Sequence, residues 1–205
     1  DRGCHNSSAT GEYHCHQGPL DGRTFDSEAA ASRALEGGTS AGGQTRETGR
    51  WAYERELYGD WRDANGDCQD TRDEVLAAQG RLIERSPDGC EVIDGVWRGP
   101  FTGRTYTDPG DLHIDPVVPL KEAHISGARS WSASKRRRFA NDRDNLLAVE
   151  AGENMSKGSR GPSEWLPETG RCRYVEQWVA VKRKWGLRMD AEERAAVDRL
   201  LGQCR

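Results

Sequence analysis

Two short apolar runs, followed by a polar segment, constrain the fold more than any other part of the chain. The first run is Asp111–Leu120, the second is Asn141–Val149, and the polar segment Glu153–Gly158 comes shortly after the second run. Short apolar runs bounded by Pro, Asn and Asp favour strands rather than helices. We therefore predict two short strands and then a helix, with a basic segment inserted between the strands.

The composition allows one sizeable domain, or a domain with a small appendage. Of the 205 residues, 34% are hydrophobic and 31% are charged, so we expect a modest core to which the seven Trp contribute large buried areas. No run of about 18 apolar residues occurs, so the sequence predicts no membrane span. The formal net charge of −4 does not by itself indicate a nucleic-acid partner, but the positive charge is clustered, and clusters decide local binding.

The cysteines indicate an oxidising compartment. Their number, six, is even and no C-x-x-C pair occurs, which favours disulfides over zinc. Sequential pairing is the simplest connectivity and gives Cys4–Cys15, Cys68–Cys90 and Cys172–Cys204. The sequence also begins at Asp1 without Met or an apolar leader, as a processed secretory protein would. We expect a secreted, extracellular protein.

We predict three segments along the chain. Residues 1–36 form a small appendage closed by a disulfide, residues 37–50 a flexible linker, and residues 51–205 the main domain. The linker has many Gly and Ser and no large apolar side chain, so burial cannot offset its ordering entropy. Within the appendage, Glu12–Phe25 resembles the YHCH-type segment of various exported bacterial proteins, and Ser27–Leu35 is expected to form a short helix.

Histidines of the appendage allow two interpretations. His5, His14 and His16 stand near Cys4 and Cys15, and such a set could bind a transition metal. The alternative is a disulfide-closed knot with exposed imidazoles, because cysteines that pair with each other are not available as metal ligands.

Caps, turns and apolar spacing predict the elements of the main domain. Thr71 and Glu74 match a capping box that begins a helix. The Asp-Gly pair within Glu91–Trp97 predicts a hairpin turn. Near the end of the chain, apolar residues at helical spacing predict an amphipathic helix ended by Gly186 and a last helix capped by Asp190.

Four acidic or amide residues match positions 1, 3, 5 and 12 of a calcium-binding loop: Asp63, Asn65, Asp67 and Glu74. Position 6 of that loop is Cys68, where the calcium loop carries a Gly that permits a sharp turn. Two interpretations remain open, a Ca²⁺ site and a capped helix entry with solvated acids.

Three fragments occur in the order of a known signature. Asp-x-Val-Val-Pro at residues 115–119, Asn-Leu at 145–146 and Asn-x-x-Lys-Gly at 154–158 resemble the HNH (ββα-metal) endonuclease signature. Further fragments extend the likeness over about residues 51–204: Gly59–Trp61, Gly66–Arg72, Ser126–Ala128, Phe139–Asp142 and Glu164–Pro167. Together they resemble secreted actinobacterial HNH nucleases related to the C-terminal domain of GmrSD-type restriction enzymes.

The resemblance implies a site for one divalent cation, Mg²⁺ or Mn²⁺. Asp115 and Asn154 match the two metal ligands of the family. Asn145 matches the asparagine that holds the intervening loop and orients the base, and Lys157 is implied to meet a phosphate. A cation held by only two protein oxygens keeps positions open for phosphate and relieves the charge that develops there.

Pro116 stands where the family carries its general-base histidine, and proline has no side-chain nitrogen that could accept a proton. Three explanations remain open. The substitution leaves binding intact but cripples turnover; or His113 or His124 acts as the base; or the cation activates water without a side-chain base, at a rate about 10²–10⁴ lower. In an extended strand His113 shares a face with Asp115, whereas residue 116 points the other way.

A basic segment between the two strands is the expected contact with nucleic-acid backbone. It consists of Lys135, Arg136, Arg137 and Arg138, and it is extended by Arg129 and Arg143, with Trp131 as a stacking face. Each neutralised phosphate adds affinity that depends on salt and not on sequence. The alternative is an ordinary solvated helix face.

We therefore expect an α+β protein with a ββα-metal (HNH) nuclease core, surrounding helices and a small appendage. The expected function is that of a secreted, monomeric, metal-dependent endonuclease that hydrolyses DNA, with RNA as an alternative substrate, at low sequence specificity. Pro116 is expected to weaken or abolish turnover. Two alternatives are a non-catalytic nucleic-acid-binding protein on the same scaffold and an extracellular calcium-binding interaction module.

Overall fold

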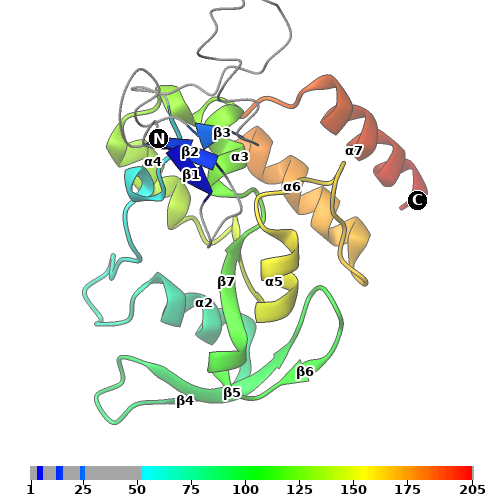
Figure 1. The fold of residues 1–205 in the computed structure, drawn as a ribbon. Helices are drawn as coiled ribbons and strands as arrows, with labels where there is room; N and C mark the ends of the chain where they lie inside the picture. Colours follow the sequence, from blue (N-terminus) through cyan, green and yellow to red (C-terminus); the bar gives the residue numbers. More distant parts are fainter. Residues whose placement is uncertain (1–3, 7–12, 16–23, 26–51, 205) are drawn as a thin grey trace, which may run out of the picture. The chain divides into compact units, whose positions relative to one another are not determined.

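The computed structural model describes residues 4–6, 13–15, 24–25 and 52–204, and the chain divides into two compact units, residues 1–47 and 48–205 (Figure 1). The predicted linker at 37–50, the predicted helix at 27–35 and His16 lie outside the described residues. The domain boundaries given above therefore stay a prediction.

The first unit contains a three-stranded antiparallel sheet in the order β1-β2-β3. These strands are β1 (Cys4–Asn6), β2 (Tyr13–Cys15) and β3 (Thr24–Phe25). The register of β1 and β2 places Cys4 opposite Cys15 and His5 opposite His14. This backbone register is compatible with the predicted Cys4–Cys15 bridge, which stays a prediction.

The second unit has a mixed α+β fold with small sheets, as expected. Its helices are η2 (Arg55–Tyr58), α2 (Thr71–Gln79), η3 (Pro109–Asp111), α3 (Leu120–Ile125), η4 (Ala128–Ser130), α4 (Ala133–Ala140), α5 (Ala151–Lys157), α6 (Arg171–Trp185) and α7 (Ala191–Gln203). Its strands are β4 (Arg81–Arg85), β5 (Val92–Arg98), β6 (Thr105–Tyr106), β7 (Leu112–Pro116) and β8 (Leu146–Glu150). One sheet has the order β4-β5-β6 and the other pairs β7 with β8.

At the centre of this unit, β7 and β8 pair antiparallel and α5 follows β8 directly. The register runs from Leu112 opposite Glu150 to Pro116 opposite Leu146. The segment between the two strands carries α3 and α4, and α5 lies beside β7 (Figure 1). The two strands and the helix predicted from residues 111–157 are thus present, in the predicted order.

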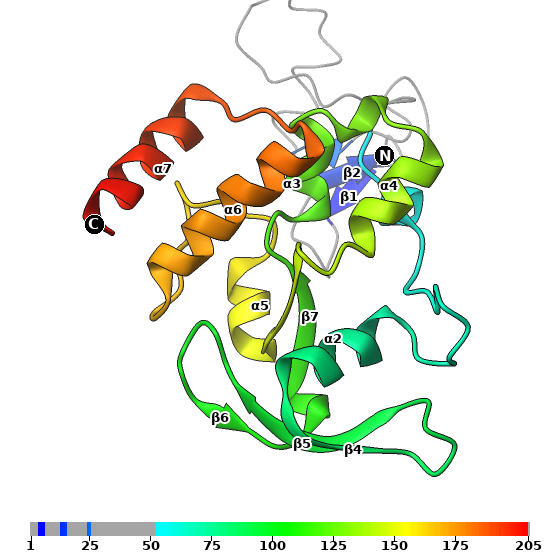
Figure 2. The ribbon, with the colours of Figure 1, turned by 180° about the vertical axis from the view of Figure 1, so that it is seen from behind.

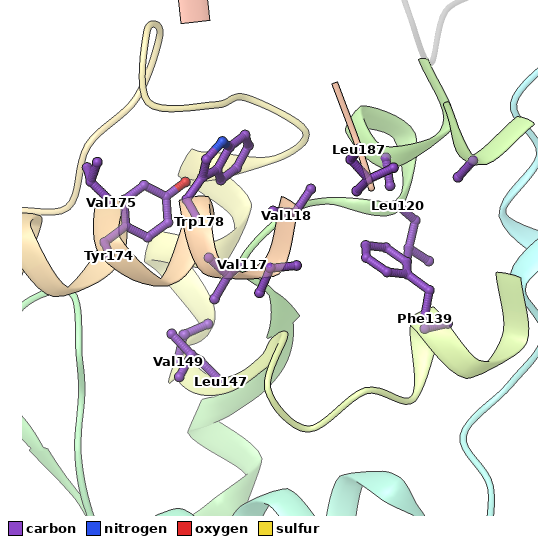
Figure 3. Close-up of a cluster of buried hydrophobic side chains, with 14 of the residues drawn as sticks. Val117, Val118, Leu120, Phe139, Leu147, Val149, Tyr174, Val175, Trp178 and Leu187 are labelled. Atoms are coloured by element: carbon purple, nitrogen blue, oxygen red, sulfur yellow. The ribbon is translucent and has the colours of Figure 1, made fainter. Parts of the chain in front are cut away.

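Apolar side chains pack on both faces of the β7–β8 ribbon. Successive side chains of a strand point to opposite faces, so each strand contributes to two apolar clusters. On one face Ile114 and Leu146 pack in an apolar cluster with residues of α2 and β5. On the other face Leu147 and Val149 join the larger core, which includes Tyr174 and other residues of α6 (Figure 3). The apolar residues of the ribbon therefore fix its position between α2 and α6.

The hairpin turn predicted within Glu91–Trp97 is wrong, because β5 runs without a break from Val92 to Arg98. The turn lies earlier, where Gly89 adopts a φ of 82°, and it joins β4 to β5. Gly95 lies inside the strand, where the ring of Trp97 leaves no room for a side chain. A Cβ at this position would lie 2.5 Å from the ring of Trp97, so the glycine makes room for a buried indole.

The predicted capping box at Thr71 is also wrong. The cap of α2 is Asp70, whose carboxylate accepts hydrogen bonds from the backbone N–H groups of Arg72 and Asp73. Thr71 is buried and donates its hydroxyl to Asn141 Oδ1 at 2.7 Å. The threonine therefore ties the start of α2 to the end of α4 instead of capping the helix.

Two predicted disulfides are confirmed. Cys68–Cys90 joins the loop before α2 to the start of β5, and Cys172–Cys204 joins the beginning of α6 to the end of α7. The predicted helix ends are confirmed as well. Gly186 closes α6 with a φ of 69°, and Asp190 caps α7 by accepting the backbone N–H of Glu193 at 2.8 Å.

Candidate functional site

The candidate site lies where α5 covers one face of β7. His113 and Asp115 are two residues apart on β7 and therefore share a face. Asn154 and Lys157 are three residues apart on α5 and therefore also lie on a common side. Asn154 contacts His113, and Lys157 contacts Asp115. The structure thus brings together four residues that the sequence had singled out.

Lys157 and Asp115 form a buried ion pair, with exposed fractions of 0% and 3%. The ammonium donates to Oδ1 at 3.0 Å and to the carbonyl oxygen of Pro116 at 3.0 Å. Burial raises the pKa of the Asp115 carboxyl despite the neighbouring ammonium, and burial lowers the pKa of Lys157 despite the neighbouring carboxylate. In this arrangement the predicted phosphate-binding lysine has a carboxylate as its partner.

Oδ2 of Asp115 is buried and accepts no hydrogen bond among the described residues. Lys157 Nζ lies 2.8 Å from this oxygen, but its geometry there is that of an ion-pair contact and not of a hydrogen bond. A buried carboxylate oxygen with unused acceptor capacity is costly unless another partner completes its surroundings. The ammonium of Lys157 already supplies one charged partner, and a divalent cation at the same carboxylate would be a second.

Asp115 and Asn154 line a common cavity of about 430 Å³. Ile114, Asp115 and Pro116 all contribute to its lining. Leu146, which pairs with Pro116 in the register of the ribbon, lines the cavity as well. The cavity therefore lies beside β7, at the end of the ribbon that carries Pro116.

The amide of Asn154 is oriented by His113. Its Nδ2 lies 3.1 Å from His113 Nδ1, and with the amide in this orientation Nδ1 accepts the hydrogen bond. This contact leaves Oδ1 of Asn154 as the free oxygen of the amide. One carboxylate oxygen and one amide oxygen fit a hard cation that keeps several waters.

The described residues contain no group of three or more His, Cys, Asp or Glu that could hold a metal ion. A closed protein cage of zinc type is therefore absent from this part of the chain. A cation held by the oxygens of Asp115 and Asn154 would have its remaining ligand positions open to water.

Asn145 holds the segment that follows β7. It is completely buried, its Oδ1 accepts the N–H of Val118 at 2.9 Å, and its Nδ2 donates to the carbonyl oxygen of the same residue at 3.3 Å. Its backbone carbonyl accepts the N–H of Val117 at 2.7 Å. These contacts match the loop-holding role implied for Asn145, whereas its role toward a base stays a prediction.

Neither predicted substitute for the missing base has a free acceptor nitrogen in the cavity. His113 Nδ1 accepts from Asn154. His124 is buried on α3, 3.3 Å from the hydroxyl of Tyr58 and edge-on to Tyr53, and it does not line the cavity. Pro116 lines the cavity but has no group that accepts a proton from water.

Further side chains of the cavity were not expected from the sequence. Arg55 and Lys121 contribute two positive charges, and Tyr53 and Trp61 contribute two aromatic rings. Nothing in the spacing of Arg55 or Lys121 along the sequence marks them as residues of a site. They come to the cavity because η2 and α3 are both brought beside β7, which only the fold reveals.

Only part of the predicted basic patch is free to contact a nucleic-acid backbone. Arg136 donates to the carbonyl oxygens of Leu57 and Trp131, and Lys135 Nζ lies 4.1 Å from the centre of the Trp131 ring. These residues thus stabilise α4, and Trp131 is covered on that side. Arg137 and Arg138 are exposed on α4.

The two predicted extensions of the patch lie outside α4. Arg143 lies beyond the end of α4, with 61% of its side chain exposed and 3.8 Å from Glu74. Arg129 is half-buried on η4. Nucleic-acid binding by this set stays a prediction.

The acidic loop before α2 is closed by hydrogen bonds to its own backbone. Asp63 accepts the N–H groups of Gly66 at 2.7 Å and Cys68 at 2.9 Å. Desolvation opposes these bonds, but they prevail and lower the pKa of Asp63. Asn65 donates to Asp67, and Glu74 lies on α2 near Arg143. This geometry is that of a capped turn, and Ca²⁺ binding stays a prediction.

Comparisons with known proteins add two findings. The model of the C-terminal domain of GmrSD restriction endonucleases matches residues 70–196, which include the whole β7–β8–α5 unit. An uncharacterized secreted protein of Arthroderma benhamiae is 38% identical over 157 residues, which cover 74% of this chain and 76% of that protein. No solved structure matches the chain.

The residues of the candidate site lie within the part of the sequence that the family model matches. Asp115, Asn145, Asn154 and Lys157 all lie within the matched residues, as does Cys90 of the Cys68–Cys90 bridge. No described helix is long and apolar enough to cross a membrane. The chain belongs to the family of GmrSD restriction endonuclease C-terminal domains.

Proposed function

We propose that this protein is a secreted, HNH-type endonuclease that hydrolyses phosphodiester bonds with the help of one divalent cation held by Asp115 and Asn154. The observation that carries the proposal is the cavity beside β7, which is lined by both Asp115 and Asn154. Mg²⁺ is the expected cation, with Mn²⁺ as its usual substitute, because both ligand atoms are oxygens.

A bound cation would relieve the negative charge that develops on the phosphate during hydrolysis. The chain itself supplies the remaining parts of the site. Arg55 and Lys121 line the same cavity and would draw the phosphate towards it. Asn145 fixes the segment after β7, and Lys157 offsets the charge of the buried Asp115.

Pro116 limits the proposed activity. It contributes no proton acceptor to the cavity, and the Nδ1 lone pair of His113 already accepts from Asn154. Proton removal from the attacking water therefore depends on solvent. We expect slow turnover, below that of a histidine-containing relative by about 10²–10⁴-fold.

We propose DNA as the main substrate, with RNA as the alternative, cleaved outside the cell by a monomer. Family membership supports a nucleic-acid substrate. The two disulfides and the relative described as secreted support an extracellular location. The sequence carries no zinc-finger or homeodomain motif, which fits low sequence specificity.

Plasmid nicking tests the proposal. Supercoiled plasmid is incubated with the protein and Mg²⁺ or Mn²⁺, and the same reaction with EDTA serves as the metal-free control. We expect slow conversion to nicked circles, lost in Asp115→Ala and in Asn154→Ala. Equal nicking by the wild type and by both variants would assign the activity to a contaminant or another site, and would overturn the proposal.

One observation favours a second candidate, a non-catalytic nucleic-acid-binding protein on the same scaffold, and this observation is Pro116. Complete retention of supercoiled plasmid together with a gel shift would support that candidate. The third candidate, a calcium-binding interaction module, predicts heat on titration with Ca²⁺ that disappears in Asp63→Ala.

A further inference from the structure

A groove lined by arginines runs along the other side of the ribbon, away from the candidate site. Two neighbouring cavities, of about 600 and 610 Å³, share six residues of their lining, namely Gln79, Arg98, Pro100, Leu147, Arg173 and Gln177. Because they share these residues, the two cavities form one continuous groove. Its lining comes from α6, from α2 and from β5, elements that are labelled in Figure 2.

The strand that borders this groove is β8. Leu146, Leu147 and Ala148 are consecutive and all contribute to the lining, so the groove follows the edge of β8 that does not pair with β7. The cavity of the candidate site is lined by β7, η2, α3 and α5, and it shares with the groove only Leu146. The groove is therefore separate from the proposed catalytic cavity.

The groove is strongly basic in a protein whose formal net charge is −4. Its cationic lining, called the arginine groove below, comprises Arg81, Arg98, Arg143 and Arg173, together with Lys184. The one acid of the lining is Asp144, and its carboxylate already bonds to Lys184 at 2.7 Å. The arginines therefore face no competing carboxylate within the groove.

Three of these arginines have no partner of their own. Arg81, Arg98 and Arg173 are exposed and make no ion pair or side-chain hydrogen bond with any residue that the structure describes. They come from β4, β5 and α6, so three separate elements direct guanidinium groups to one groove. Such groups bind phosphate oxygens with two parallel hydrogen bonds.

The polar groups on the floor of the groove are mostly engaged. Gln79 donates to the carbonyl oxygen of Leu146 and accepts the N–H of Ala148, and Gln177 donates to the carbonyl oxygen of Asp144. Few groups remain that could read the edge of a base. The groove can therefore attract negatively charged phosphate groups without selecting a base sequence.

We propose that the arginine groove binds the sugar–phosphate backbone of a nucleic-acid strand, as an exosite separate from the cavity of Asp115. The proposal deepens the proposed function, because it names the part of the substrate that the groove recognises. Arg98 and Arg173 are its central contacts, since both line the two cavities where they meet. Binding here needs no divalent cation.

Binding without cleavage tests the groove. A fluorescein-labelled single-stranded oligonucleotide is titrated with the full-length protein in EDTA, and fluorescence anisotropy is read at several salt concentrations. For Arg98→Ala with Arg173→Ala we expect binding about tenfold weaker at low salt, and a salt slope smaller by about 1.4, since each contact with a single strand contributes about 0.7. The double Lys variant, which keeps both charges, should bind nearly as the wild type does.

The control is Arg183→Ala with Arg199→Ala, which removes the same charge from exposed positions of α6 and α7 outside the groove. Its binding should stay within about twofold of the wild type, because distant exposed charges are screened by salt. Equal weakening by both double variants would reduce the effect to net charge and overturn the exosite. No binding by the wild type would overturn it as well.

Failure of the exosite and failure of the nuclease proposal give different results. If the wild type nicks plasmid but the Arg98 and Arg173 variant binds the oligonucleotide normally, the exosite is wrong and the nuclease stands. If the wild type binds through these arginines but no metal supports nicking, the exosite stands and the nuclease is wrong. Thermal melting of each variant confirms that it is folded.

Discussion

The ammonium nitrogen of Lys157 lies 2.8 Å from Oδ2 of Asp115, and neither side chain is exposed to solvent by more than a few per cent of its surface. An internal cation thus already neutralises the carboxylate that we propose as a metal ligand. Removal of one partner of such a pair leaves a buried charge without compensation. The first prediction follows from this dependence.

Replacement of Lys157 by Met should destabilise the protein by about 3–5 kcal/mol, because the buried carboxyl of Asp115 would lose its ion-pair partner. Urea unfolding measures the loss. If Asp115 binds a divalent cation, Mg²⁺ or Mn²⁺ should raise the melting temperature of Lys157→Met more than that of the wild type. The double variant Lys157→Met with Asp115→Leu is the control and should lose this response. An equal response of all three proteins would contradict metal binding at Asp115.

Replacement of Pro116 by His should increase plasmid nicking by about 10²–10⁴-fold, the usual contribution of a general base. Pro116 lines the cavity beside Asp115, so a histidine at this position is placed near the proposed attacking water. The initial rate of nicking in Mg²⁺ is the measurement. Pro116→Ala controls for loss of the proline ring, and a histidine variant no faster than the alanine variant would speak against the HNH assignment.

Replacement of Lys121 by Ala should weaken substrate binding in the active background of Pro116→His. Lys121 is exposed at the rim of the cavity, so its removal should raise KM by roughly three- to tenfold at low salt and leave kcat little changed. High salt should reduce the difference. The matched control is Arg199→Ala on α7, and a KM change of the same size there would remove the specific role of Lys121.

Replacement of Lys182 by Met should destabilise the fold strongly without a direct effect on the site. Its ammonium is completely buried and lies 2.7 Å from a carboxylate oxygen of both Glu122 and Glu193. The loss should be about 3–5 kcal/mol in urea unfolding, because two carboxylates lose their partner. Arg183→Met, at the exposed next position, should cost less than about 0.5 kcal/mol.

Replacement of Cys172 and Cys204 by Ser should cost about 3–4 kcal/mol, since the bridge closes a segment with a sequence separation of 32. The ends of α6 and α7 would then be joined only by packing. Unfolding of the wild type in reductant should show a loss at least as large, because the Cys68–Cys90 bridge would open too. An unchanged midpoint in the double Ser variant would contradict this role.

The sequence predicted the centre of the fold well, because its signals there are local. Apolar runs marked β7 and β8, and the spacing of Asn154 and Lys157 put both side chains on one side of α5. The spacing could not reveal the partner of Lys157. That partner is Asp115, which is distant in sequence and reaches the lysine only because α5 packs on β7.

Local signals failed where packing overrules them. The Asp-Gly pair of β5 is a strong turn signal, yet Gly95 lies inside a strand because the ring of Trp97 occupies the space of a side chain. Arg55, Lys121 and the arginine groove escaped the sequence for a related reason. Their members come from separate elements, and no pattern along the chain records that these elements meet.

Leu146 contributes to the lining on both sides of the ribbon, that of the cavity with Asp115 and that of the arginine groove. At this position one residue borders both spaces. A smaller residue there would enlarge both spaces at once, and a larger one would narrow both. The two compartments therefore share one wall, and neither can be reshaped at that point independently of the other.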